Sequence, residues 1–259
     1  MGIYHSKMMG ALRCLLPLTL FWFSMNNATA AEIKVLSAGA VEPGILKIID
    51  KFRRETGHDV KITFATAPAI SKRAGAGETV DIVIAPPVVL DEWVKAEKAA
   101  QADRVTIGRI GVGVMVRADA PPPKISTVNE FKQSLLSAES VVYNQASTGI
   151  YLEGLFERLG IAGQLKPKTT RYPDAAAVLS HISKGHGNEI GLGATTVIIE
   201  GESIGLKFVG PLPEDIQNYT AYAAILAAKG AVSDAAREFI GYLAAPLAKQ
   251  IFGAAGIMD

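Results

Sequence analysis

Three short segments of the chain combine small and hydroxyl-bearing residues in a pattern that suits the binding of an anion. They are Ser37-Ala38-Gly39-Ala40, Thr66-Ala67-Pro68-Ala69 and Asn144-Gln145-Ala146-Ser147-Thr148-Gly149. Ser, Thr and Asn side chains donate hydrogen bonds, and Gly lets a ligand approach the backbone closely. The same residue types are favoured as helix N-caps, so one such segment alone indicates only a helix start. Three of them in one chain favour a binding site.

The elements around these segments alternate between strand and helix. Apolar β-type runs at Ile33 to Ala38, Asp59 to Ala65 and Val141 to Tyr143 come before them, and helical patterns follow. Such alternation predicts an α/β fold with a parallel sheet covered by helices on both faces. In open sheets of this kind the carboxyl ends of the strands face the ligand crevice. Helix N-termini at that edge offer free N–H groups and a partial positive charge, which favour anions.

Composition excludes several classes of protein. The 259 residues include 26 Lys and Arg against 25 Asp and Glu, and this balance argues against nucleic-acid binding, which needs a basic face. A single cysteine rules out a disulfide framework and a cysteine-based zinc site. His181 and His186 are five positions apart, and Gly185 and Gly187 would break a helix between them, so no helical zinc motif is expected. We expect neither a metal nor a cofactor.

The first thirty residues have the pattern of a secretory signal peptide. Lys7 and Arg13 are basic, the run from Cys14 to Phe23 is apolar, and Ala28-Thr29-Ala30 is an A-x-A cleavage signal. The apolar run is shorter than the roughly 20 residues that span a bilayer. We expect cleavage before Ala31 and a periplasmic protein; the alternative is an uncleaved anchor.

Further segments resemble a known family. Phe52-Arg53-Arg54-Glu55-Thr56-Gly57, Gly77-Glu78-Thr79-Val80-Asp81-Ile82-Val83-Ile84-Ala85 and the stretch from Gly149 to Gly160 are similar to segments of periplasmic molybdate-binding proteins of ABC importers. Closer still is a molybdate-like subgroup with segments similar to Val41-Glu42-Pro43-Gly44 and Gln217-Asn218-Tyr219-Thr220. The resemblance covers essentially the whole mature chain.

The resemblance implies the type II periplasmic binding fold, in which two α/β lobes are joined by two crossover segments. Lobe 1 would comprise residues 31–107 and 220–259, and lobe 2 residues 108–219, with crossovers near Gly108 to Val112 and near Tyr219. A small anionic ligand would lie between the lobes, and closure would bury it. The closed protein, a monomer, would dock on an ABC permease in the inner membrane.

The ligand of this chain need not be molybdate. In the molybdate family neutral hydroxyls and backbone N–H groups hold the oxyanion, but the corresponding positions here are Ala40, Ala67 and Ala194. A hydrogen bond to a charged group contributes roughly 1.5–3 kcal/mol, and a micromolar complex needs only about 8 kcal/mol. Our hypothesis is therefore a different anion, such as a small organic carboxylate. Arg73 could pair with a carboxylate, although a solvent-facing role suits its helix better.

We predict a ligand site without catalytic residues. Glu42 is included because it follows the first loop, where a negative charge would disfavour a bare dianion. The predicted ligand-binding residues are Ser37, Gly39, Ala40, Glu42, Thr66, Ala67, Asn144, Ser147, Thr148, Gly149, Thr195 and Tyr219.

The sequence lacks the motifs of a nucleophilic enzyme. There is no G-x-S-x-G nucleophile elbow and no Cys–His pair in the mature chain. We therefore expect a solute-binding protein that captures a molybdate-like oxyanion or a small organic carboxylate, and not an enzyme. The alternatives are a periplasmic ligand-sensing protein and, with less support, a secreted α/β hydrolase.

Overall fold

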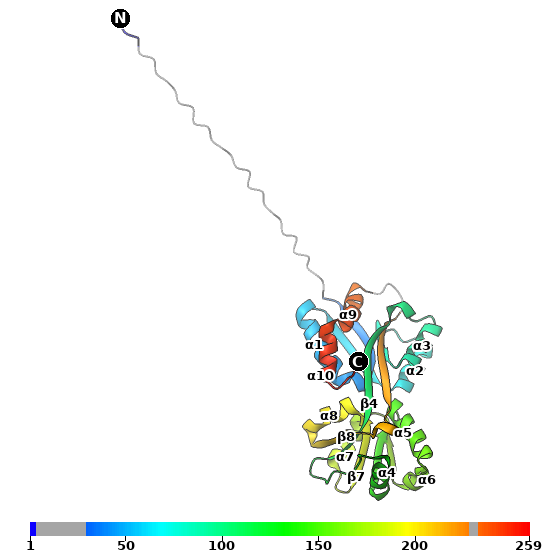
Figure 1. Cartoon of the computed structure of the whole chain (residues 1–259). Coiled ribbons are helices and arrows are strands. Elements are labelled where there is room, and N and C mark those ends of the chain that lie inside the picture. Colours follow the sequence, from blue (N-terminus) through cyan, green and yellow to red (C-terminus); the bar gives the residue numbers. More distant parts are fainter. Residues whose placement is uncertain (4–29, 228–232) are drawn as a thin grey trace.

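A computed structural model of the protein describes residues 1–3, 30–227 and 233–259. Figure 1 shows the whole chain. The predicted signal peptide falls almost entirely on residues 4–29, which lie outside the described part. Among the described residues, no helix combines the length and apolar character needed to cross a bilayer.

Strands and helices alternate along most of the chain, as the sequence pattern predicted. The strands are β1 (Glu32–Ala38), β2 (Asp59–Ala65), β3 (Ile82–Ala85), β4 (Val105–Arg117), β5 (Ser140–Asn144), β6 (Thr169–Tyr172), β7 (Glu189–Ala194), β8 (Leu206–Pro211) and β9 (Tyr219–Leu226). The helices are α1 (Glu42–Thr56), α2 (Ala67–Ala76), α3 (Pro87–Lys95), α4 (Val128–Ser137), α5 (Ser147–Arg158), α6 (Ala162–Leu165), α7 (Ala175–Lys184), α8 (Thr195–Gly201), α9 (Asp234–Ala244) and α10 (Pro246–Ala254).

The strands join in the order β2-β1-β3-β9-β4-β7-β5-β6, and β8 pairs with β4 at the side of this path. β1 lies parallel to both β2 and β3, and β5 lies parallel to both β6 and β7. The long strands β4 and β9 pair antiparallel with each other and connect these two parallel groups. Two parallel βαβ groups with helices confirm the predicted α/β class.

The buried apolar residues form clusters that belong to two separate parts of the molecule. The first core includes Phe52, Trp93 and Phe239 and involves β1, β2, β3, β9 and the helices α1, α2, α3, α9 and α10; we call this part lobe 1. The other core clusters include Phe131 and Met115 and involve β5, β7 and the helices α4 to α8; we call this part lobe 2. Figure 1 shows the two lobes one above the other, with β4 running between them.

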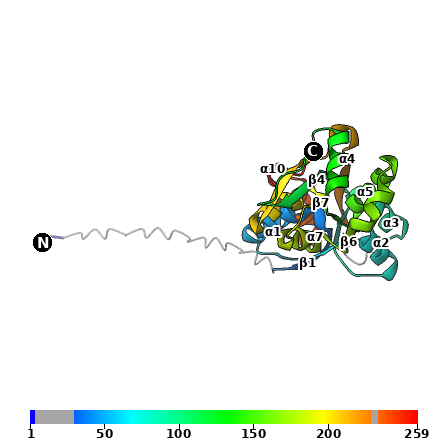
Figure 2. The ribbon, with the colours of Figure 1, turned by 90° about the horizontal axis from the view of Figure 1, so that it is seen from below.

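Helices cover both faces of the strands in each lobe. Seen end-on in Figure 2, α1 and α10 lie on one side of the central strands, and α2, α3 and α5 lie on the other. In Figure 1 the pair α1 and α8 meets at the lobe boundary on one side, and α2 and α5 approach it on the other. The N-terminal ends of helices from both lobes therefore point toward the same boundary.

The crossover is held by backbone contacts around β4. Gly108 has φ +144°, and a Cβ there would overlap the carbonyl oxygen of Met258, so this close approach requires glycine. The backbone of Arg109 exchanges two hydrogen bonds with Met258, at 2.7 and 2.9 Å. On the return segment the Gln217 amide accepts a hydrogen bond from Val112 N at 2.9 Å and donates one to Val112 O at 3.0 Å. β4 and the return segment are thus held together by hydrogen bonds next to the start of β9.

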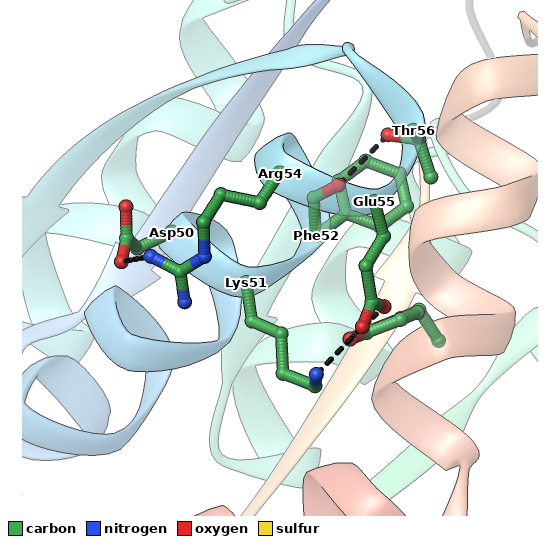
Figure 3. A network of polar contacts seen from close by, with 7 residues as sticks. Asp50, Lys51, Phe52, Arg54, Glu55 and Thr56 are labelled. Carbon is green, nitrogen blue, oxygen red and sulfur yellow. Dashed lines mark hydrogen bonds and ion pairs between the residues drawn. The ribbon is translucent and has the colours of Figure 1, made fainter.

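Local sequence signals explain the position of α1. Pro43 stands in its first turn, where a missing N–H costs nothing, and Gly57 ends it in the left-handed conformation at φ +77°. Near its end, Lys51 pairs with Glu55 at 2.6 Å, Arg54 pairs with Asp50, and Thr56 Oγ1 donates to the Phe52 carbonyl at 2.9 Å (Figure 3). These exposed ion pairs contribute little stability, so burial of one apolar face fixes the helix, and its first residues reach the lobe boundary.

Candidate ligand-binding site

A cavity of about 270 Å³ lies at the boundary between the lobes. It is far larger than the roughly 10–15 Å³ that holds one water molecule, so a ligand of several non-hydrogen atoms fits. Its walls come from the C-terminal ends of β1, β2, β5 and β7 and from the helix starts that follow them. The lining residues are Ala38, Gly39, Ala40, Glu42, Phe64, Ala65, Thr66, Ala67, Asn144, Ala146, Ser147, Thr148, Asp174, Ala175, Ala176, Ala194, Val197 and Tyr222.

Most of the residues expected at the site are gathered around this cavity. They are contributed by both lobes and by three separate strand-to-helix segments. The members are Gly39, Ala40, Glu42, Thr66, Ala67, Asn144, Ser147 and Thr148. Their convergence follows from the parallel strands, because the carboxyl ends of such strands meet at one edge of the sheet.

Four expected residues lie outside the lining. Ser37 is fully buried, and its hydroxyl donates to the Ala38 carbonyl at 3.2 Å. Gly149 is buried in α5, and a Cβ there would overlap the carbonyl oxygen of Asn144. Thr195 begins α8 beside Gly113. Tyr219 is 47% exposed, and its ring lies under the Arg109 guanidinium, whose carbon is 5.2 Å from the ring centroid.

The cavity also includes residues that were not proposed from the sequence. The most informative is Tyr222 on β9, which is only 4% exposed and whose hydroxyl has no hydrogen-bond partner within the described residues. Tyr219 and Tyr222 are three positions apart on one strand, so they face opposite sides of it. That alternation is the signal that could have selected Tyr222, had the direction of the return strand been known. Phe64, Val197 and the start of α7 carry no comparable signal.

Helix starts at the cavity leave their first N–H groups available. Val41 precedes α1, Thr66 precedes α2 and Ala146 precedes α5, and none of them makes a side-chain cap hydrogen bond. An uncapped helix has up to four N–H groups without an intrahelical partner. At α7, by contrast, Asp174 Oδ1 accepts from Ala177 N at 2.9 Å. The starts of α2 and α5, one on each lobe, are thus the best-placed backbone donors.

The remaining polar groups of the cavity are mostly uncharged. Asn144 Oδ1 accepts from Ala146 N at 3.0 Å, which leaves the side-chain amide N–H groups of Asn144 free to donate. Thr66, Ser147 and Thr148 add hydroxyls. Within the described part of the chain, no lysine or arginine lines the cavity. The hydrogen-bond donors that line the cavity are therefore hydroxyls, one amide and the N–H groups of helix starts.

Glu42 brings a carboxylate to this cavity. It is the first residue of α1, and within the described chain no hydrogen bond or ion pair holds its side chain. Partial burial raises the pKa of Glu42 above its usual range, and the negative charge of Glu200 on α8 raises it further. Burial also raises the pKa of Tyr222, which stays a neutral hydroxyl across the ordinary pH range. The cavity thus holds one carboxyl group that takes up a proton readily and one neutral phenol.

One hydrogen bond connects the lobes beside the cavity. Thr196 Oγ1 on α8 donates to the Ala40 carbonyl at 2.7 Å. Thr196 is only 1% exposed, so this bond is shielded from water. The contact holds the α1 and α8 sides of the two lobes together next to Glu42.

Other candidates considered from the sequence lie elsewhere. Arg73 does not line the cavity and pairs with Glu78 at 3.1 Å. His181 Nδ1 lies 2.8 Å from the Tyr172 hydroxyl, in a separate open groove of lobe 2. Across residues 1–3, 30–227 and 233–259, no group of three or more His, Cys, Asp or Glu side chains is arranged to hold a metal ion.

The sequence is similar to a family of solute-binding proteins and to two named bacterial proteins. A family model described as bacterial extracellular solute-binding protein matches residues 33–257. A Pseudomonas sp protein named aconitate isomerase is 31% identical over 220 residues, which cover 82% of each chain. The molybdate-binding protein ModA of Escherichia coli (strain K12) is 27% identical over 240 residues, covering 88% of this chain and 90% of that one.

A solved structure confirms the fold. The periplasmic molybdate-binding protein of Azotobacter vinelandii superposes with a TM-score of 0.74 at 17% identity, and the match covers 88% of this chain and 99% of that chain. This likeness, together with the two lobes and the crossover strands, confirms the predicted type II periplasmic binding fold.

Proposed function

The chain belongs to the bacterial extracellular solute-binding proteins, and from that premise we propose that it binds a small organic anion with more than one carboxylate between its lobes. It then delivers this anion, as a periplasmic monomer, to an ABC permease of the inner membrane. Its residues 1–30 are removed on export. Supporting this boundary, Ala31 N donates to His58 Nδ1 at 3.1 Å, and β1 begins at the next residue, directly after the expected cleavage site.

The observation that carries the choice of ligand is the replacement of hydroxyls by methyl groups in the cavity wall. Ala40, Ala67 and Ala194 occupy the positions where the resemblance to molybdate-binding proteins implies hydroxyl donors, and all three line the cavity. Phe64 and Val197 add further apolar surface. A bare tetrahedral oxyanion has no hydrocarbon to place against such walls. An organic acid does, because its carbon skeleton separates its charged ends.

The N–H groups at the helix starts can bind the carboxylates at the two ends of the ligand. α2 belongs to lobe 1 and α5 to lobe 2, so two carboxylates on one ligand can be bound by opposite lobes. Each hydrogen bond to a charged group contributes roughly 1.5–3 kcal/mol. Three to five of them reach the roughly 8 kcal/mol of a micromolar complex. Because neither lobe alone supplies all the donors, binding favours closure.

The named relatives support the same choice. The 31%-identical protein is named for aconitate, which is a tricarboxylate, and the more distant ModA is named for molybdate. The expectation that this chain is not an enzyme rests on the lack of a nucleophile motif and of a metal motif. That reasoning disfavours hydrolases. It does not address a proton shift, which needs neither a nucleophile nor a metal.

A ligand screen tests the proposal. The mature protein is mixed with molybdate, tungstate, sulfate, phosphate and mono-, di- and tricarboxylates, and melting is followed before calorimetry. A bound ligand stabilises the fold by about 2.7 kcal/mol at a hundredfold excess over its dissociation constant. We expect di- or tricarboxylates to give the largest shift. Molybdate binding tighter than every carboxylate would overturn the proposed ligand class.

A double variant tests whether the alanines of the cavity wall determine the ligand class. Ala40→Ser with Ala67→Ser returns two hydroxyls to the cavity wall. If these positions determine the ligand class, the double variant gains affinity for molybdate relative to the unmodified protein. Ala76→Ser, at the far end of α2, serves as the control and leaves all affinities unchanged. Equal molybdate affinity in all three proteins would show that the alanines do not set the ligand class.

A further inference from the structure

The carboxylate of Glu42 lies in a cavity that is proposed to bind an anion, and two negative charges repel each other. Glu42 lines the cavity, and no partner within the described residues neutralises it. When ionised, it repels an anionic ligand, and Glu200 adds a second negative charge nearby. A protein that only binds an anion gains no attraction from an ionised carboxylate at this position. A protein that removes a proton from its ligand needs such a group, because a base must lie within reach of the ligand's carbon.

Tyr222 provides the second group that such chemistry needs. Its side chain is 4% exposed, lines the same cavity, and has a hydroxyl without a hydrogen-bond partner among the described residues. Since burial raises its pKa, the hydroxyl remains a neutral donor. A buried donor aimed at a place where negative charge develops stabilises that charge far better than water does. β9, on which it lies, is one of the two crossover strands and pairs with both β3 and β4.

We propose that the cavity catalyses an allylic proton shift in a bound unsaturated polycarboxylate, with Glu42 as the base and Tyr222 as the donor that stabilises the intermediate. This inference rests on the proposed function, because the helix starts must first hold the carboxylates. Its substrate class is an acid in which a CH₂ group lies between a carboxylate and a carbon–carbon double bond.

The electrons and protons of this reaction balance without a co-reactant. Ionised Glu42 takes a proton from the CH₂ group, and the C–H electron pair forms a new double bond toward the centre of the ligand. The former double-bond pair moves to the far carbon and its carboxylate, where Tyr222 and the helix N–H groups stabilise the charge. Glu42 then returns a proton to that far carbon. The product is an isomer, and both side chains end in their starting states.

The raised pKa of Glu42 suits this role. A base is most effective when its pKa lies near the working pH, because it is then both ionised and strongly basic. Partial burial and Glu200 both act in that direction. Asp174, the other carboxylate of the lining, accepts the cap hydrogen bond of α7 at 2.9 Å and is thereby occupied.

Two probes separate this inference from the proposed function. The saturated propane-1,2,3-tricarboxylate has no double bond and reports binding only, by calorimetry. The cis and trans isomers of aconitate report conversion, by proton NMR. We expect the unmodified protein to bind the saturated acid and to interconvert the two isomers. Binding without conversion would overturn the proton shift and leave the proposed function intact. Failure to bind any polycarboxylate would overturn both.

Variants then test the two groups. Glu42→Gln should lower conversion by at least about 100-fold while it binds the saturated acid equally well or more tightly. Tyr222→Phe should lower conversion by about 100-fold with binding changed only a few-fold. Glu157→Gln is the control, because Glu157 lies near the far end of α5, about 15 Å along the helix from Ser147. Unchanged conversion in Glu42→Gln would overturn its assignment as the base.

Discussion

Helices that begin at the cavity differ from helices that begin elsewhere in how their first turn is satisfied. On α4, Thr127 Oγ1 accepts from Glu130 N at 3.2 Å, and on α9, Ser233 Oγ accepts from Ala236 N at 3.2 Å. At the cavity, α2 follows Thr66 and α5 follows Ala146, and neither residue makes such a bond. On α4 and α9 a side chain of the protein thus satisfies part of the first turn. At the cavity the first turn is left for a ligand to complete.

Not every helix start away from the cavity is capped. α3 and α10 begin with Pro87 and Pro246, which reduce the number of N–H groups that need a partner, and Pro68 does the same in the first turn of α2 at the cavity. α7 reaches the cavity but is capped by Asp174, so it offers fewer free donors there. The comparison predicts opposite responses to substitutions at the two kinds of helix start.

The largest effect is expected from a cap placed at the cavity. Ala146→Asp adds an acceptor for the first N–H groups of α5 together with a negative charge. Losing hydrogen bonds to a charged ligand, at roughly 1.5–3 kcal/mol each, lowers carboxylate affinity by about 100-fold. The unliganded protein gains about 1 kcal/mol in its free energy of unfolding. Calorimetry and urea denaturation measure the two changes.

Its matched control is Ala245→Asp, at the equally uncapped start of α10 away from the cavity. Ala245 also ends α9, where a negative charge is unfavourable, so this variant should gain less stability, but it should keep full ligand affinity. If both variants lost affinity alike, the uncapped start of α5 would have no special role in binding.

The next effect concerns how closely α5 approaches β5. Gly149→Ala places a methyl group on the Asn144 carbonyl oxygen and pushes the helix start away. Overpacking of this kind costs roughly 1–3 kcal/mol of stability, and ligand affinity should fall as well. Gly163→Ala, where a Cβ meets open space, should change stability by less than about 0.5 kcal/mol. Equal behaviour of the two variants in urea denaturation would contradict the close approach.

A pair of threonines gives the most direct crossed test. Thr127→Ala removes the cap of α4 and should lower the free energy of unfolding by about 1 kcal/mol without changing ligand affinity. Thr66→Ala removes a hydroxyl that caps nothing, so stability should change little while carboxylate affinity falls a few-fold. The pattern fails if Thr66→Ala destabilises the unliganded protein as much as Thr127→Ala does.

The smallest effect is the pH dependence of Glu42. Its pKa is raised in the folded protein above the value of 4.5 in the unfolded chain. Its contribution to stability is therefore fully present below pH 4.5 and is lost as the pH rises through the raised pKa. Glu42→Gln should be more stable than the unmodified protein at pH 7, and the difference should disappear at acid pH.

Thermal melts of both proteins between pH 4 and pH 8 measure this difference. Glu200→Gln is the companion variant. It removes one cause of the raised pKa of Glu42 and leaves the carboxyl group of Glu42 in place. With Glu200→Gln in the background, the pKa of Glu42 should lie closer to its unfolded value. The stability difference between the protein with Glu42 and its Glu42→Gln variant should then develop over a narrower pH range. A stability difference that stays constant with pH would show that Glu42 does not titrate differently in the folded state.

Local features of the fold were predictable from the sequence because they depend on neighbouring residues. Pro43 and Gly57 mark the two ends of α1, and Asp174 and Ser233 cap α7 and α9. The strand-to-helix segments that carry Thr66 and Ser147 were identified as the edge of a site for the same reason. Small polar residues after a strand indicate a helix start, and parallel strands bring such starts to one edge.

Features that depend on the pairing of strands far apart in the chain could not be predicted from the sequence. Tyr222 reaches the cavity because β9 returns antiparallel between β3 and β4, whereas the chain alone favoured Tyr219. Ser37 has the right residue type and lies beside the cavity residues, yet its hydroxyl is fully buried in the sheet. A side chain's direction on a strand depends on the partner strand and the register.

The sequence by itself determined the α/β alternation, the helix ends and the residue types available for anion binding, because periodicity, caps and turn residues act over a few positions. Only the tertiary structure decided which helix starts share a cavity and that Glu42 lies near Glu200. It also decided that the Tyr222 hydroxyl remains without a partner among the described residues. These relations join residues more than a hundred positions apart, such as Thr196 and Ala40. Their geometry follows from the packing of two lobes around the crossover strands, which local sequence signals do not encode.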